Sequence, residues 1–255
     1  MQELKEVGRP VVRVDAADKV TGRAKFTDDL CPKPCLEAKL LHSTIANGRV
    51  VSIDTSEALE VPGVVAVFTC FDVPDIAYPV AGHPWYADSA AAKRDQADRK
   101  LLDDRVRIYG DNIGVVVAED TVACDRALKL IKVEYEEWPV VYDPKESLAL
   151  GAAEGGAEHP VQDRKPDNLV AHTLAVTSDD KLAALGYSSV EDAINDPAYH
   201  HVSLHMESRE QSQVHIETCT SYCYMENNKI VCVSSTQIPH VVRRVIGQAL
   251  GIPWG

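Results

Sequence analysis

The sequence has 255 residues, a hydrophobic fraction of 45% and a formal net charge of −13, which is ordinary for a globular protein of one large or two modest domains. Basic residues form no stripe of the kind that nucleic-acid binders carry, so the acidity argues against nucleic-acid and anionic-membrane partners. No apolar run approaches the roughly 18 residues of a membrane span, and the charged N-terminus lacks a signal-peptide core, so we expect a cytoplasmic protein.

The first 150 residues contain short apolar runs separated by turn signals such as Asn47-Gly48 and Pro62-Gly63. These runs predict strands at 11–14, 36–41, 49–53, 64–68, 106–109, 113–118 and 133–135. Asp120 is placed to cap a helix over 121–132, in which apolar residues recur three and four positions apart. Strands, turns and a helix in this order predict an α+β fold.

The segment 151–171 is rich in glycine, proline and charge and has little periodicity. It predicts a linker between a first domain at 1–150 and a second domain at 172–255. The patterns of the second domain predict helices at 189–194 and 240–250, and strands at 200–206, 221–225 and 229–233. Asn227-Asn228 predicts a hairpin turn between the last two strands, and Gly251 predicts the end of the last helix.

Two groups of cysteines are candidates for a metal site. They are Cys31 and Cys35, within CPKPC, and Cys219, Cys223 and Cys232, with His215 nearby. Thiolates and imidazoles are zinc ligands, but the spacing lacks the usual two-residue gap and matches no iron–sulfur pattern. The alternative is a set of small, reduced thiols, which is also what an odd total of seven cysteines favours over a disulfide framework.

Histidines form another candidate cluster, made of His200, His201, His205 and His215. On a strand at 200–206, His201 and His205 would share one face and could together bind a metal. The alternative, which is commoner in proteins, is that these histidines are solvated or hydrogen-bonded to other groups.

Adjacent glutamates at 134, 136 and 137 could form an acid/base pair. On a strand, however, Glu134 and Glu136 point away from the side of Val133 and Tyr135, which indicates a solvated face. The sequence has no phosphate-binding GxxxxGK[ST] or GxGxxG motif and no GxSxG elbow. Motifs alone therefore predict only an α+β protein.

Several blocks, in order along well over half of the chain, resemble the molybdenum-binding subunit of the xanthine dehydrogenase and aldehyde oxidase family. The blocks are 7–30 (VGRPVVRVDAADKVTGRAKFTDDL), 36–54, 61–76, 106–141 and 205–240 with the helix after it. The resemblance implies the "hammerhead" α/β domain followed by the beginning of the molybdenum-cofactor-binding domain. The insert at 81–99 favours xanthine dehydrogenase over carbon monoxide dehydrogenase, whereas residues 172–200 depart from the family pattern.

One cofactor-binding residue is implied by the resemblance, namely Gln237 in SSTQ. In the family, the glutamine at this position hydrogen-bonds an oxo ligand of the molybdenum, and an amide can do so without adding charge. The alternative is a polar residue at a strand end that caps the helix after Pro239. No catalytic residue of the family falls within these residues, since its glycine-rich loop, its arginine and its glutamate base are expected beyond Gly255.

The resemblance implies an enzyme with a molybdenum–pterin cofactor that hydroxylates a purine such as xanthine with water-derived oxygen. Its electrons would pass to 2Fe-2S clusters and FAD on partner subunits and then to NAD. The stretch present here is expected to be a fragment of that subunit and to be inactive alone. The alternative is a non-catalytic hammerhead-type assembly module that docks to the Fe-S and flavin subunits.

Overall fold

The computed structural model describes residues 7–8, 10–79, 97–153, 157–160, 167–169, 176–209 and 211–254. Contacts divide the chain into one compact unit of Met1–Val141 with Glu217–Gly255, and another of Tyr142–Ile216. This grouping places the C-terminal hairpin and helix with the first unit. It differs from the predicted division into 1–150, a linker at 151–171 and 172–255, which stays a prediction.

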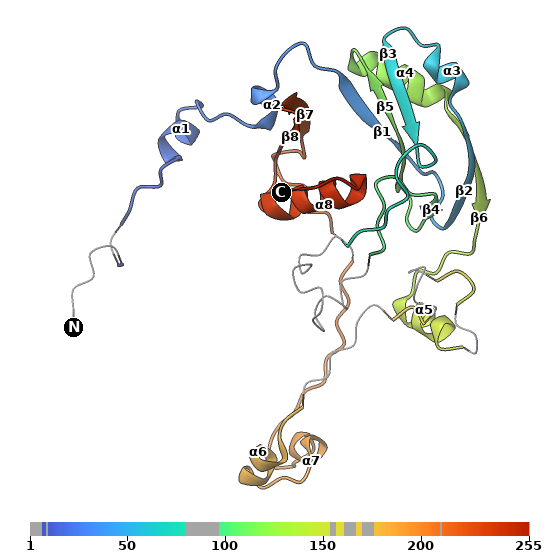
Figure 1. The fold of residues 1–255 in the computed structure, drawn as a ribbon. Coiled ribbons are helices and arrows are strands. Elements are labelled where there is room, and N and C mark those ends of the chain that lie inside the picture. Colours follow the sequence, from blue (N-terminus) through green and yellow to red (C-terminus); the bar gives the residue numbers. More distant parts are fainter. Residues whose placement is uncertain are drawn as a thin grey trace. The chain divides into compact units, whose positions relative to one another are not determined.

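Six strands of the first unit form two antiparallel sheets of three strands each (Figure 1). The first sheet has the order β1-β5-β3, with β1 at Glu37–His42, β5 at Asn112–Ala118 and β3 at Val64–Thr69. The second has the order β4-β2-β6, with β4 at Arg105–Val106, β2 at Gly48–Asp54 and β6 at Lys132–Glu137. Consecutive strands β1 and β2 therefore lie in different sheets.

Two helices, α3 at Ser56–Leu59 and α4 at Thr121–Leu130, pack on the first sheet (Figure 1). The core between them consists of small and β-branched side chains: Ala58, Val116, Ala118, Ala123, Cys124 and Ala127. Small side chains let the helix backbone approach the strands closely and still exclude water. A second core cluster joins Ile45, Val50, Val106 and Ile113.

Helix α4 begins at the residue that the sequence indicated. The Asp120 carboxylate accepts a hydrogen bond from the backbone N–H of Ala123 at 2.7 Å, which satisfies one of the free donors of the first turn. The predicted cap is confirmed.

Removal of this cap is expected to destabilise α4. We expect Asp120→Ala to lower the free energy of unfolding by about 1 kcal/mol, because an N–H at the helix start loses its acceptor. Hydrogen exchange of the α4 amides measures the effect. Asp125→Ala is the matched control, since Asp125 lies on the exposed surface of the same helix and only pairs with Lys39 at 2.6 Å. An equal loss of protection in both variants would contradict the capping role.

The described residues of the second unit include three short helices: α5 at Pro144–Gly151, α6 at Asp179–Ala184 and α7 at Val190–Ile194. Asp143 caps α5 by accepting from the Lys145 N–H at 2.6 Å, and Ser189 caps α7 by accepting from the Asp192 N–H at 3.0 Å. The predicted helix at 189–194 is thus present. The sequence patterns did not predict α5 or α6, nor the short helices α1 at Ala16–Val20 and α2 at Thr27–Leu30.

A hairpin and a helix end the described chain. Strands β7 at Ser221–Glu226 and β8 at Lys229–Ser234 pair antiparallel in a separate two-stranded sheet. Asn227 and Asn228 have φ angles of 48° and 60°, the left-handed geometry of a two-residue type I′ turn. The predicted hairpin is confirmed. Helix α8 follows at Pro239–Leu250 and ends at Gly251, whose φ of 66° is the usual left-handed cap.

Two predicted strands are absent. Residues 11–14 and 200–206 adopt irregular backbone, and their apolar side chains are largely exposed. A strand needs a partner for its backbone N–H and C=O groups, and no described segment pairs with either stretch. Of a third predicted strand, 106–109, only Val106 lies in a strand, the two-residue β4. Among the helices of the described part, none has the length and apolar character needed to cross a membrane.

Candidate functional site

Gln237 lies in the bend that joins β8 to α8, and its side chain is exposed. The backbone on either side of it is held by short-range hydrogen bonds. Thr220 N–H donates to Ser235 Oγ at 3.1 Å, and Ser235 N–H donates to the Thr220 carbonyl at 3.0 Å. On the other side, Ile238 N–H donates to Thr236 Oγ1 at 3.1 Å. These hydrogen bonds therefore hold the backbone on both sides of Gln237.

The amide of Gln237 makes no hydrogen bond with any residue that the structure describes. Its NH₂ group remains able to donate and its oxygen to accept. A polar side chain at a strand end that served only to cap the next helix would accept a hydrogen bond from the first turn, but the start of α8 has no side-chain cap. The geometry thus gives no support to the capping alternative.

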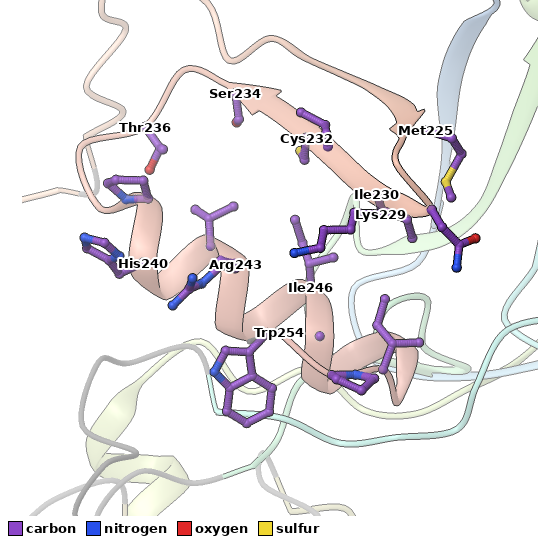
Figure 2. A pocket seen from close by; sticks show the side chains of 17 residues that line it. Met225, Lys229, Ile230, Cys232, Ser234, Thr236, His240, Arg243, Ile246 and Trp254 are labelled. Atoms are coloured by element: carbon purple, nitrogen blue, oxygen red, sulfur yellow. The ribbon is translucent and has the colours of Figure 1, made fainter.

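A cavity of about 980 Å³ lies between the hairpin and α8 (Figure 2). Strand β8 supplies one wall with Ile230, Cys232 and Ser234, and the helix supplies the other wall with residues that include Val242 and Ile246. Thr236 and Pro239, on either side of Gln237, line the cavity at the start of the helix, whereas Gln237 is not among its lining residues. The cavity and the exposed amide are therefore neighbouring features of one loop.

The basic side chains that line the cavity are a lysine, an arginine and a histidine. Lys229 next to the turn and Arg243 on α8 line it together with His240, and among the lining residues that the structure describes there is no carboxylate. Two fixed positive charges in a partly apolar hollow favour an anionic or electron-rich occupant. This character contrasts with the net charge of −13 of the whole sequence.

Helix α8 is amphipathic, as its spacing predicts, but its apolar side is partly covered. Ala249 is buried, and the other apolar positions of the helix are half-buried rather than exposed. A Cβ at Gly247 would lie 2.9 Å from the Trp254 Cβ, so the chain after the helix folds back against it. Arg244 is buried and donates to Gln248 Oε1 at 2.6 Å. The apolar side of the helix is therefore largely covered within this chain.

The structure brings the candidate cysteines together only as pairs. Cys223 and Cys232 are directly opposite each other in the hairpin. Loss of water contact, with a hydrogen bond to the Cys35 thiol, raises the pKa of Cys31. Within the part of the chain that the structure describes, no group of three or more histidine, cysteine or acidic side chains is arranged to hold a metal ion.

The candidate histidine and glutamate clusters are not arranged as binding or catalytic sites. His201 and His205 lie on irregular backbone, so the shared strand face that would have joined them does not exist. The glutamates lie on β6 as predicted, with Glu134 and Glu136 exposed and Val133 and Tyr135 half-buried. Glu134 accepts from Ser52 Oγ at 2.8 Å. These carboxylates form a solvated face of the sheet.

Comparison with known proteins identifies both parts of the chain. Residues 21–139 match the model of the aldehyde oxidase and xanthine dehydrogenase a/b hammerhead domain, and residues 165–255 match the model of the molybdopterin cofactor-binding domain. The chain belongs to the aldehyde oxidase and xanthine dehydrogenase family. The predicted α+β fold, a hammerhead domain followed by the start of the cofactor-binding domain, is confirmed.

Similar proteins extend this assignment. The chain is 42% identical over 244 residues to the xanthine dehydrogenase molybdenum-binding subunit of Escherichia coli O157:H7, a match that covers 95% of the chain and 30% of that protein. It is 30% identical over 247 residues to the carbon monoxide dehydrogenase large chain of Hydrogenophaga pseudoflava, covering 92% of the chain and 28% of that protein. The chain therefore spans about 30% of the length of such relatives.

A solved structure supports the fold. The aldehyde oxidoreductase from Desulfovibrio desulfuricans ATCC 27774 matches with a TM-score of 0.71 and 25% identity, over 94% of this chain and 25% of that one. The insert at 81–99, which favoured xanthine dehydrogenase in the sequence, lies mostly outside the described residues. The higher identity to the xanthine dehydrogenase subunit points in the same direction.

Proposed function

We propose that the protein containing this chain is the molybdenum-binding subunit of a purine hydroxylase of the xanthine dehydrogenase type. The observation that supports this proposal is the 42% identity to the Escherichia coli xanthine dehydrogenase subunit, in an alignment that covers 95% of the chain and so includes both matched domains. The proposed reaction adds a water-derived oxygen to an electron-poor carbon of the purine. Electrons then leave to Fe-S and FAD subunits in the cytoplasm, and finally to NAD.

The described residues fit a molybdenum–pterin cofactor at one point. When bound, this group supplies two-electron redox chemistry that protein side chains cannot provide. The exposed amide of Gln237, without a partner among the described residues, can donate a hydrogen bond to an acceptor atom of the cofactor. The amide brings no charge and does not compete as a metal ligand.

The hairpin gives Gln237 its position. Its two strands are paired over six residues each, and the hydrogen bonds between Thr220 and Ser235 close the end of the hairpin next to the bend. A donor on such a short, anchored bend loses little conformational entropy when it binds. The hammerhead sheets contribute no described acid, base or nucleophile to this point, and we assign them to packing against partner subunits.

Substitution of Gln237 in the complete cofactor-loaded enzyme tests the proposal. We expect Gln237→Ala to lower kcat for xanthine about 100-fold, as the loss of a single positioned donor does in other enzymes. Molybdenum content, measured by elemental analysis, shows whether the cofactor still binds. Gln213→Ala is the control, because Gln213 is an exposed glutamine on irregular backbone in the other unit.

Two results would contradict the proposal. If Gln237→Ala kept its kcat at full molybdenum content, the proposed role of the amide would be wrong. If neither the complete enzyme nor its Gln213→Ala control turned over xanthine, the proposed substrate class would be wrong. The 255-residue chain by itself is expected to show no turnover, because it spans only about 30% of the length of its xanthine dehydrogenase relative.

A further inference from the structure

We propose that Cys223 and Cys232 form a reversible dithiol–disulfide site on the β7–β8 hairpin, which nothing in the proposed hydroxylase function requires. The two cysteines are directly opposite each other in the strand register. Each lies on a strand of its own, and the strands are held together by backbone pairing on both sides of the cysteines. The two Cα atoms therefore have a fixed separation, and both side chains lie on the same face of the hairpin.

The register gives the distance between the two residues. The two-residue turn makes Glu226 and Lys229 the first opposed pair, which in such a turn is hydrogen-bonded. Hydrogen-bonded and non-hydrogen-bonded pairs then alternate along the ladder. Three steps further, Cys223 and Cys232 form a non-hydrogen-bonded pair, whose Cα atoms lie about 4.5 Å apart. A disulfide accepts Cα separations of about 4.4 to 6.8 Å, so the bond can form without backbone movement.

The thiols are also accessible. Cys223 is exposed, and Cys232 is half-buried on the wall of the cavity, where Figure 2 shows it projecting from β8. Partial loss of water contact, together with the neighbouring Cys232 thiol, raises the pKa of Cys223 to about 11. The opposed register places the two side chains next to each other on one face of the hairpin. The raised pKa leaves little thiolate at neutral pH, so oxidation is expected to be slow rather than spontaneous.

The chemistry balances with a small-molecule disulfide such as oxidised glutathione. One protein thiolate attacks the glutathione disulfide, releases one glutathione thiol and forms a mixed disulfide. The second protein thiolate attacks the protein sulfur of that mixed disulfide and releases the second glutathione thiol. The protein gives up two protons and two electrons and gains one S–S bond, and the oxidised glutathione becomes two reduced molecules.

The test is to incubate the 255-residue chain with oxidised glutathione at mildly alkaline pH and to map the products. Cys219→Ser serves as the background, because no trypsin site separates Cys219 from Cys223, whereas Lys229 separates Cys223 from Cys232. The linked tryptic peptides then report one bond. We expect the Cys223–Cys232 link to exceed mixed disulfides at these positions about tenfold, because its second step is intramolecular.

A shifted pair provides the matched control. Cys232→Ser with Val233→Cys keeps two thiols in the hairpin but turns one to the opposite face of the strand. This variant should accumulate separate glutathione adducts and little cross-link. The proposal is overturned if the native pair also collects separate adducts, or if the shifted pair closes as readily as the native one. The Cys31 and Cys35 thiols do not interfere, since both fall in a different tryptic peptide.

Discussion

Gly48→Ala is expected to disrupt the second sheet of the hammerhead domain. A Cβ at this position would lie 2.2 Å from the backbone carbonyl oxygen of Glu136 and 2.7 Å from Ile45 Cδ1. The first contact is with paired backbone, because Gly48 and Glu137 are opposed in the β2–β6 ladder. The strands would have to separate, which costs the ladder its hydrogen bonds. We expect a loss of about 3 kcal/mol or more in the free energy of unfolding.

The control is a glycine with an unusual backbone but free space. Gly110 has a φ of 94° and no heavy atom within 4 Å of an added Cβ. Gly110→Ala should therefore cost only the conformational strain, about 1 to 2 kcal/mol. Hydrogen exchange of the β2 and β6 amides distinguishes the two variants. Similar loss of protection in both would show that the close approach at Gly48 does not limit the sheet.

Arg105→Ala is expected to have an effect of similar size. The Arg105 side chain is buried, and its Nη1 donates to Asn47 Oδ1 at 2.7 Å and to the Gly48 carbonyl at 3.1 Å. Its guanidinium lies 4.6 Å from the centre of the Trp138 ring. Alanine would leave buried acceptors without a donor and would open a gap under the indole. We expect a loss of about 3 kcal/mol, because unsatisfied buried polar groups are costly.

Two further variants separate charge from geometry. Arg105→Lys keeps the positive charge but loses the planar fork and the stacking on Trp138, so it should recover only part of the stability. Arg49→Ala removes an exposed arginine that lies 3.4 Å from Asp104, and it should change stability little. Denaturant unfolding measures all three. Full recovery by lysine would show that charge alone matters, and an equal loss in Arg49→Ala would contradict a special role for the buried side chain.

Both positions also show why sequence patterns described the sheets incompletely. Asn47-Gly48 predicts a tight turn between two strands, and the strands at 36–41 and 49–53 are present. However, their partners lie far along the chain: β1 pairs with β5, and β2 pairs with β6. The role of Gly48 comes from the backbone of Glu136, which is distant in sequence. The predicted turn at Asn47-Gly48 is only partly present: residues 44–47 form a bend between the two strands, and Gly48 is already the first residue of β2. The contact that requires glycine there was not visible in the sequence.

The candidate site was predictable to a smaller degree. Gln237 followed from the resemblance in SSTQ, and the structure adds that its amide is exposed on an anchored bend. The sequence indicates Cys223 and Cys232 only as possible metal ligands, whereas their pairing depends on the register set by the Asn227-Asn228 turn. The prediction of a strand at 200–206 was wrong, because an apolar alternation does not form a strand without a neighbouring strand to pair its backbone N–H and C=O groups.

The sequence by itself determined several local elements and the family. The caps at Asp120 and Gly251, the hairpin turn and the apolar spacing of α4 and α8 are set by residues within a few positions of each other. The order of the family blocks depends on sequence alone in the same way. Only the tertiary structure decided which strands share a sheet and which two cysteines lie opposite each other. It also supplies the contacts that make substitution of Gly48 or Arg105 costly. Those outcomes depend on backbone pairing and burial between distant segments, which a local pattern does not encode.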